Sequence, residues 1–204
     1  SYAAKPDRNR LMNLAADYLT AGGFTEIMSN SLTKESYYEG LTSYPAARCV
    51  RILNPLSADL NVMRQTLLFN TMEAVQLNAN RRNGNLRLYE FGNCYFYDEA
   101  ARDAEKPLSS YSEQYRLAIA VTGAAVPQSW NAKPQASSFF TLRAVAEKLL
   151  RRFGLDIYAL KCEPLQSDLF GDGISLSAGN GRELLQMGVV APRIRRAFDL
   201  KQEV

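Results

Sequence analysis

The sequence contains no histidine among its 204 residues. This absence excludes serine–histidine and cysteine–histidine nucleophile pairs, and it removes every histidine metal ligand. With only three cysteines, Cys49, Cys94 and Cys162, a zinc site made of four thiolates is excluded as well. The glycine-rich phosphate loop G-x-x-x-x-G-K-[ST] and the dinucleotide fingerprint G-x-G-x-x-G are also absent. What remains is catalysis by carboxylates or lysine, phosphate binding by arginine, or no chemistry at all.

The cysteines lie far apart in the sequence and are odd in number, which makes a poor disulfide framework and indicates a reducing compartment. We therefore expect free thiols within or beside strands. No apolar run is long enough to span a bilayer, and the opening SYAAKPDRNR lacks the core of a signal peptide. These features predict a soluble, cytoplasmic chain, and its abrupt ends suggest a segment of something longer.

The composition is that of an ordinary globular domain, with 47% apolar and 22% charged residues, and we expect a single domain over residues 1–204. The net charge of +3 allows contact with nucleic acid but does not argue for it. An acidic stretch holds Asp98, Glu99, Asp103 and Glu105. It lacks the ligand spacing of a metal-binding loop, so we expect a solvated loop and no metal site.

Hydrophobic periodicity and turn residues outline the secondary structure. Helices are predicted over Asp7–Ala21, from a Thr33 cap to Tyr38, over Thr66–Arg81 and Phe140–Phe153, and from Pro192 onward. Strands are predicted over Phe24–Ser31, Cys49–Leu53, Leu117–Thr122, Ile157–Cys162, Gly173–Ser177 and Glu183–Val190, with a strand pair inside Leu86–Asp98. Hairpins joined by turn-rich loops favour antiparallel pairing, so this order predicts an α+β fold with one mixed-to-antiparallel sheet and helices packed against it.

One arginine stands between apolar neighbours in the stretch NPLSADLNVMRQTLLFN, which runs from Asn54 to Asn70. Asp59 is a candidate partner for Arg64. The following helix is expected to bury a stripe against the sheet, formed by Leu68, Met72, Val75 and Ala79. That stripe leaves three apolar side chains for an exposed edge near the helix start, those of Met63, Leu67 and Phe69. Such an edge indicates a contact site, and we expect Arg64 to order it, with little effect on the stability of the domain alone.

The segment RILNPLSADLNVMRQTLLFNTMEAVQLNANRR, followed by LRLYEFGNCYF, resembles the β subunit of bacterial phenylalanine–tRNA ligases. The similarity is to the module of that subunit that is built like a class II aminoacyl-tRNA synthetase core. SFFTLRAVAEKLLRRFGL and MGVVAPRIRRAFDL resemble later parts of the same module, so the resemblance extends from Pro6 to Val204. It implies a class II synthetase-like, mostly antiparallel sheet flanked by helices.

The resemblance also implies a division of labour. In that family the α subunit carries the aminoacylation site, and the β module is a degenerate copy that pairs with it in an (αβ)2 assembly. The whole enzyme uses ATP and magnesium to join phenylalanine to its tRNA, and we assign neither ligand to this segment. The family's first motif lies at the subunit interface, which here implies interface roles for Asn54, Pro55, Met63, Arg64, Gln65, Leu67 and Phe69.

The residues present argue against a working site. A working class II site of the family that this chain resembles uses a strand motif, F-R-x-E, whose arginine and glutamate lie on one strand face. Here Arg87 and Glu90 are three positions apart, so they point to opposite faces of a regular strand. A working site also ends in a glycine-rich strand with Glu-Arg, whereas LLQMGVVAPRIRR has one glycine and no such pair. We therefore expect no catalytic residues in this chain.

Two alternatives stay open at this point. The first is an active class II ligase core in which Arg87 and Glu90 form the ATP strand. The second is a tRNA-binding module that uses the densest basic cluster, Arg193, Arg195 and Arg196. A solvated helix face explains the same cluster without any ligand.

Overall fold

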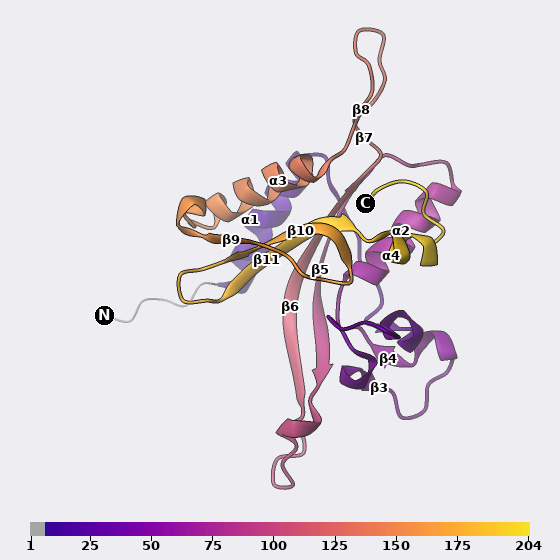
Figure 1. Cartoon of the computed structure of the whole chain (residues 1–204), viewed down its shortest axis with the longest axis vertical. Helices are drawn as coiled ribbons and strands as arrows, with labels where there is room; N and C mark the ends of the chain where they lie inside the picture. Colours follow the sequence, from indigo (N-terminus) through magenta and orange to yellow (C-terminus); the bar gives the residue numbers. More distant parts are fainter. Residues whose placement is uncertain (1–6) are drawn as a thin grey trace.

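The computed structural model describes residues 7–204. Figure 1 shows a long central hairpin with helices packed around its upper part, and with smaller strand groups beside it. The predicted α+β architecture is confirmed, but the strands form four separate sheets rather than one. Within the described part of the chain, no helix is both long and apolar enough to cross a membrane.

The central hairpin consists of β5 (Leu86–Tyr97) and β6 (Tyr111–Thr122), which pair antiparallel without a register shift from Leu86↔Thr122 to Tyr97↔Tyr111. The prediction of two strands inside 86–98 is therefore wrong, because one strand passes straight through Gly92. β6 is also longer than the predicted Leu117–Thr122. β1 (Thr25–Glu26) pairs in parallel with β5, so the predicted strand at 24–31 shrinks to two residues.

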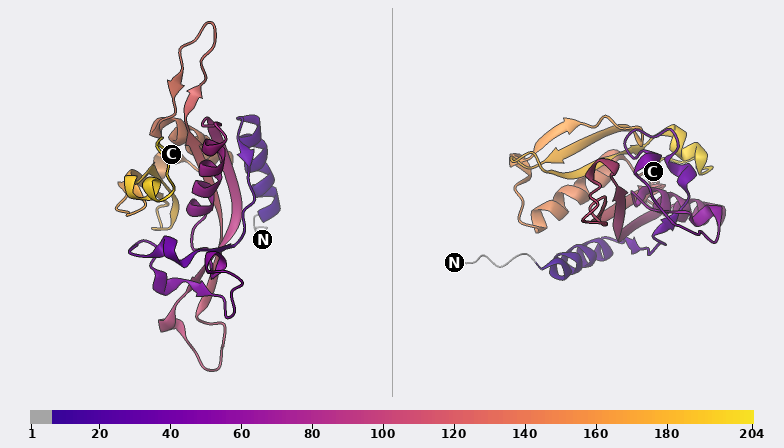
Figure 2. Two further views of the ribbon diagram at one scale, coloured as in Figure 1. Left: turned by 90° about the vertical axis from the view of Figure 1, so that its right-hand side faces the viewer. Right: turned by 90° about the horizontal axis from the view of Figure 1, so that it is seen from below.

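Two helices cover one face of the hairpin. α1 (Arg8–Ala21) begins at Asp7, whose carboxylate accepts a hydrogen bond from the Asn9 amide at 2.9 Å. α3 (Phe139–Arg152) begins with a capping box formed by Ser138 and Thr141. Figure 2 shows α1 lying along the outside of the sheet. The core beneath these helices contains Leu19, Phe24, Tyr89 and Val121.

α2 (Leu68–Asn80) covers the other face of β5, where Met72 and Val75 pack with Leu86 and Leu88 in the largest core cluster. The alternation of a strand explains this division, since Leu88 points to α2 and Tyr89 points to α1. The predicted inward stripe is confirmed, because all four of its members belong to this cluster: Leu68, Met72, Val75 and Ala79.

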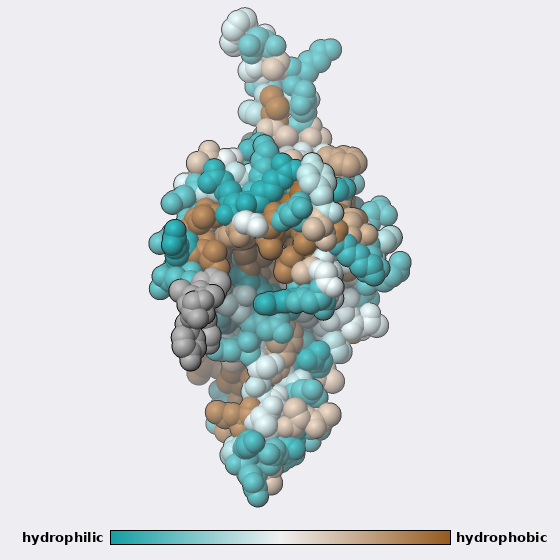
Figure 3. Space-filling view, turned by 90° about the vertical axis from the view of Figure 1, so that its left-hand side faces the viewer, coloured by the Kyte–Doolittle hydropathy of each residue, from teal (hydrophilic) through white to brown (hydrophobic). Residues whose placement is uncertain are grey.

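A second sheet, in the order β11-β10-β9, packs against α3. It contains β9 (Lys161–Pro164), β10 (Phe170–Ser177) and β11 (Glu183–Val190). The prediction for β11 is confirmed in full, whereas the predicted strand at 157–162 begins with a 3-10 helix, Ile157–Ala159. Figure 3 views this side, where apolar side chains gather around a hollow in the body of the molecule. α4 (Pro192–Ala197) follows β11 as predicted.

A small sheet joins the remaining segments in the order β2-β4-β3, with β2 (Leu32–Thr33), β4 (Val62–Met63) and β3 (Val50–Arg51). Thr33 lies in β2 and caps no helix, so its predicted role is wrong. The next segment is a 3-10 helix, Glu35–Tyr38, and the Glu35 amide donates to Asn61 Oδ1 at 2.9 Å. Three further 3-10 helices lie in loops, at Ala46–Arg48, Ala58–Leu60 and Glu99–Ala101.

A second hairpin projects from the top of the molecule in Figure 1, opposite to the tip of the central hairpin. It is formed by β7 (Ala124–Val126) and β8 (Gln135–Ala136), and we refer to residues 124–136 as the β7–β8 arm. The strands predicted from the sequence do not include this hairpin. The strands are short and lack apolar alternation, which is the signal that would have predicted them.

Candidate functional site

Arg64 and Glu90 form a buried ion pair at the centre of the molecule. Arg64 Nη1 lies 2.7 Å from Glu90 Oε1, and the two side chains are only 4% and 1% exposed. The Arg64 Nε also donates to the carbonyl oxygen of Asn93 at 3.0 Å. Ser29 completes the cluster, since its amide and its hydroxyl donate to the two carboxylate oxygens of Glu90 at 3.1 and 3.0 Å. Every contact in this cluster is therefore charge-assisted, and the ion pair itself is buried.

The main chain and one glycine hold Arg64 in place. The Arg64 amide donates to the Ser31 carbonyl at 2.9 Å, and the Arg64 carbonyl accepts from the Tyr95 amide at 2.8 Å. Gly92 leaves the space that the guanidinium fills, because a Cβ at that position would lie 2.1 Å from Arg64 Nη2. The strand therefore requires glycine in its middle for packing, not for a turn.

The expected partner of Arg64 is corrected by this geometry. Asp59 lies on the surface and pairs with Lys34 at 3.2 Å. Glu90 was missed because its role depends on how β4 and β5 meet. One signal was available, since Glu90 shares a strand face with Leu86 and Leu88, and a lone carboxylate on an apolar face implies a buried cation.

The stretch expected to form an exposed edge is mostly inside the protein. Leu67 and Phe69 are 3% and 1% exposed, so the prediction that they are exposed is wrong. Leu67 packs with Cys94 and Phe96, and Phe69 packs with the ring of Tyr38 at 5.2 Å. The predicted interface residues divide by burial into three groups: Arg64, Gln65, Leu67 and Phe69 are buried, Met63 is half-buried, and Asn54 and Pro55 are exposed.

Arg87 lies on the opposite face of β5 from Glu90. It donates to the carbonyl oxygens of Gly22 at 3.0 Å and Ala125 at 2.9 Å, and its guanidinium lies 5.9 Å from the Phe24 ring centroid. β5 and β6 pair without a bulge, so the prediction that Arg87 and Glu90 face apart is confirmed. Arg87 thus joins the end of α1 to the start of the β7–β8 arm.

The three arginines of the basic cluster differ in their surroundings. Arg193 donates to the carbonyl oxygens of Glu39 at 3.2 Å and Gly40 at 3.5 Å. Arg195 is half-buried, and Arg196 is exposed. The cluster therefore fastens α4 to the loop before Leu41 through one of its members, and it does not present three equivalent cations on a single surface.

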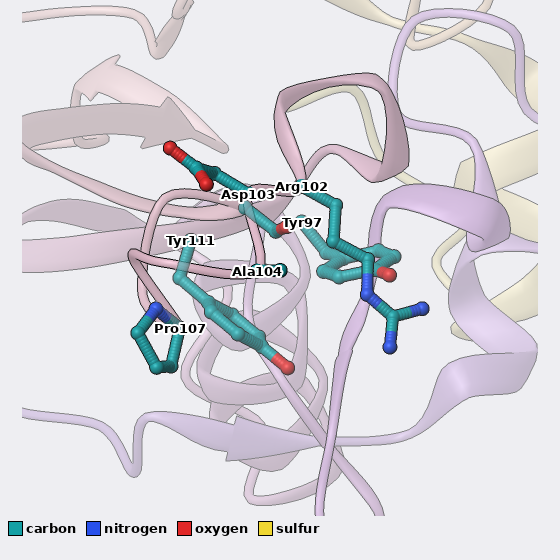
Figure 4. A pocket seen from close by; sticks show the side chains of 7 residues that line it. Tyr97, Arg102, Asp103, Ala104, Pro107 and Tyr111 are labelled. Carbon is teal, nitrogen blue, oxygen red and sulfur yellow. The ribbon is translucent and has the colours of Figure 1, made fainter.

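A cavity with a volume of about 380 Å³ lies in the tip of the central hairpin (Figure 4). Its charged lining residues, Arg102 and Asp103, are exposed, and Arg102 lies 3.4 Å from Glu99. The rings of Tyr97 and Tyr111 lie 5.4 Å apart, and in Figure 4 the Asp103 carboxylate points away from them. Within residues 7–204, no three Cys, Asp or Glu side chains gather as metal ligands would. The cavity is an open depression, and the Tyr97 hydroxyl in its lining donates a hydrogen bond to the Glu99 carboxylate.

All three cysteines are free thiols, as predicted. Cys49 and Cys94 are buried, and Cys162 is exposed. Burial raises the pKa of the Cys49 thiol, and the hydrogen bond from Gln65 Nε2 at 3.1 Å offsets only part of this effect. Burial also raises the pKa of Cys94. Neither buried thiol is prepared to act as a nucleophile, because the thiolate is the reactive form.

Comparison with known proteins connects these features to a family. Residues 1–204 match the phenylalanyl tRNA synthetase beta chain CLM domain. The phenylalanine–tRNA ligase beta subunit of Bacteroides thetaiotaomicron is 45% identical over 196 residues, which cover 96% of this chain and 24% of that protein. The corresponding subunit of Porphyromonas gingivalis is 38% identical, with 97% and 24% covered. This chain belongs to the phenylalanyl tRNA synthetase beta chain CLM domain family.

Solved structures agree on the fold. A pyrrolysyl tRNA synthetase from Desulfitobacterium hafniense aligns with a TM-score of 0.69 at 15% identity, covering 98% of this chain and 64% of that one. The CLM domain therefore has a class II aminoacyl-tRNA synthetase-like fold, as the sequence predicted. It spans about a quarter, 24%, of the length of the curated relatives that it matches.

Removing one partner of the buried pair in this CLM domain is expected to be costly. We predict that Arg64→Ala lowers the free energy of unfolding by about 3–5 kcal/mol, because Glu90 is left as an unpaired buried charge. This replaces the expectation of a small loss. Denaturant-induced unfolding of the purified domain measures the change.

Two controls make that measurement specific. Arg64→Met combined with Glu90→Leu leaves no unpaired charge, so it should recover part of the lost stability. Lys34→Ala breaks only the exposed pair with Asp59 and should change stability by less than about 1 kcal/mol. A loss for Arg64→Ala as small as that for Lys34→Ala would contradict the central role of the pair.

The thiols of the CLM domain should react at very different rates. We predict that a thiol-specific chromophore labels one cysteine rapidly in the native protein, Cys162, and that it labels all three only in denaturant. Cys162→Ser should remove the rapid phase alone. Rapid labelling of a second thiol in the native state would show that the core around Cys49 or Cys94 opens readily.

Proposed function

We propose that this chain is the non-catalytic, class II-like module of a cytoplasmic phenylalanine–tRNA ligase β subunit. Its work is to pack against the α subunit in an (αβ)2 assembly and so to support the ATP-dependent attachment of phenylalanine to tRNA. Family membership and the class II-like fold support this assignment. ATP and magnesium belong to the whole enzyme in this proposal, and tRNA is bound through that enzyme.

The observation that carries the non-catalytic role is the use of Arg87 and Glu90 within the fold. A phosphate-binding arginine must direct donors at its ligand, whereas Arg87 directs two donors at main-chain carbonyls. Glu90 uses both carboxylate oxygens on Ser29 and Arg64. Binding ATP through these side chains would break contacts that hold the strands together.

The contact surface for the α subunit is assigned to the loop at residues 53–61. Leu53 is 91% exposed and Leu56 is 102% exposed, and they flank Asn54 and Pro55. Two leucines held in water on one short loop indicate a surface that another protein covers. Arg64 supports this loop indirectly, because β4 connects the end of the loop to Arg64. In this proposal the Arg64 side chain does not itself contact the α subunit.

The first test concerns catalysis. We predict that the purified chain shows no phenylalanine-dependent exchange of pyrophosphate into ATP, because Arg87 and Glu90 are both engaged within the fold. An α–β complex assayed in parallel is the positive control. Exchange by the chain alone that disappears in Arg87→Ala would contradict the non-catalytic assignment.

The second test concerns assembly. We predict that Leu53→Ser combined with Leu56→Ser weakens binding of the β subunit to the α subunit roughly tenfold or more, because both apolar contacts are lost. Thermal unfolding should be unchanged, since neither side chain packs inside the fold. Leu108→Ser, at a position that is 78% exposed on the hairpin tip, is the matched control. Equal binding by the double variant and the control would remove loop 53–61 from the interface.

A further inference from the structure

The β7–β8 arm carries the only tryptophan of the sequence at its tip. Trp130 is 96% exposed, although its indole can bury more apolar area than any other side chain. Figure 1 shows the arm standing clear of the body. A tryptophan in this position contributes nothing to the core of its own domain, so its use lies outside the domain.

The base of the arm is firmly attached to the body. The Ala124 amide donates to Asn85 Oδ1 at 2.8 Å, and Arg87 donates to the Ala125 carbonyl at 2.9 Å. Gly123 makes the sharp turn into the arm with a φ of +74°, and a Cβ there would lie 2.3 Å from the Gly84 carbonyl oxygen. The direction of the arm is therefore fixed where it leaves the domain.

The tip is also ordered. The main chains of Ser129 and Ala132 exchange two hydrogen bonds, at 3.1 and 3.4 Å, which makes Trp130 and Asn131 the centre of a tight turn. The Ser129 hydroxyl donates to Asn131 Oδ1 at 2.8 Å. Pro127 and Pro134 stiffen the two sides of this turn. A turn whose main chain is already hydrogen-bonded loses less backbone entropy when its tip is buried.

The charge of the arm decides between classes of partner. Residues 124–136 contain one lysine, Lys133, and no other charged residue. Nucleic-acid contacts depend on neutralising several phosphates, which this arm cannot do. The centres of protein interfaces are instead poor in charge and rich in tryptophan. The arm fits an uncharged apolar pocket in a protein, with an acceptor for the indole N–H.

The location of the arm selects among protein partners. In Figure 1 the arm forms the upper end of the long axis, whereas β3 and β4, between which the chain runs through residues 53–61, lie in the lower half of the molecule. One partner at that loop would have to span the molecule to reach Trp130. About three quarters of each curated relative lies outside the matched part, since the chain covers 24% of its length.

We propose that Trp130 docks into an apolar pocket on another domain of the same β subunit, and that the β7–β8 arm fixes this domain relative to its neighbour. This inference rests on the proposed function in one respect, because it places the chain within a longer β subunit.

Fluorine NMR of fluorotryptophan-labelled protein tests the docking. The Trp130 signal is assigned by its absence in Trp130→Phe. It is recorded with a soluble paramagnetic agent in the chain of residues 1–204 and in the full-length β subunit. The agent should broaden the signal strongly in the short chain, and this broadening should be lost in the full-length β subunit without any α subunit.

Three results would overturn the proposal. Two further samples contain the full-length β subunit with the α subunit or with tRNA. The proposal is overturned if the paramagnetic agent broadens the Trp130 signal in every sample, or if the signal is protected only with the α subunit or only with tRNA. Because the decisive sample contains no α subunit, this experiment is independent of the assembly test on Leu53 and Leu56.

Hydrogen exchange of the arm provides a second measurement. In the full-length β subunit, Trp130→Ala should speed amide exchange across residues 124–136 by roughly 30-fold, as loss of an anchoring tryptophan does at protein interfaces. Tyr158→Ala, which removes an aromatic that is 87% exposed outside the arm, should leave these amides unchanged. Equal effects of the two variants would contradict docking through Trp130.

Discussion

The ion pair between Arg64 and Glu90 joins segments that are remote in the sequence: the end of β4, the middle of β5 and the segment around Ser29. Charges with side-chain exposures of 4% and 1% are tolerable only when each is neutralised and its hydrogen-bonding capacity is used. Three parts of the fold lie around this ion pair: the small sheet, β5 and the start of α2. The pair fixes the relative positions of these elements, which hydrophobic burial alone leaves adjustable.

The two faces of β5 have been put to different structural uses. On one face Glu90 holds β4 and the segment before β2, and on the other Arg87 holds the end of α1 and the start of the arm. In a class II-like fold these are residue types that suit nucleotide chemistry, yet here both satisfy polar groups of the chain itself. Both side chains therefore contribute to the rigidity of the domain, in keeping with the non-catalytic role proposed for it.

Local signals predicted the fold best. The Asp7 cap with Gly22, the apolar stripe of α2 and the apolar segment of β11 are each encoded within a short window, so their bounds were close to those observed. Features that depend on contacts between residues remote in the sequence were not predicted. Gly92 beside Asn93 has the local appearance of a turn. The glycine is instead needed because it leaves space for the guanidinium of Arg64, a contact that is remote in the sequence. Phe69 was expected on an exposed edge because periodicity assigns one inward face per helix. The rings of Tyr37 and Phe198 cover it from outside the helix, at centroid distances of 5.2 and 6.2 Å.

The absence of a side chain at Gly92 makes three positions inseparable. Any residue larger than glycine there displaces the guanidinium of Arg64, and a displaced guanidinium leaves Glu90 without its counter-ion. Changes at positions 64, 90 and 92 therefore cannot be additive in their effects on stability, since Arg64 fits only beside glycine and the buried Glu90 needs Arg64 as its counter-ion. A lineage or a designer can leave this arrangement only by changing several of these positions together, for example to an apolar set of similar volume. Each single substitution lowers the stability of the domain, whereas the original set of residues and a fully apolar set are both stable.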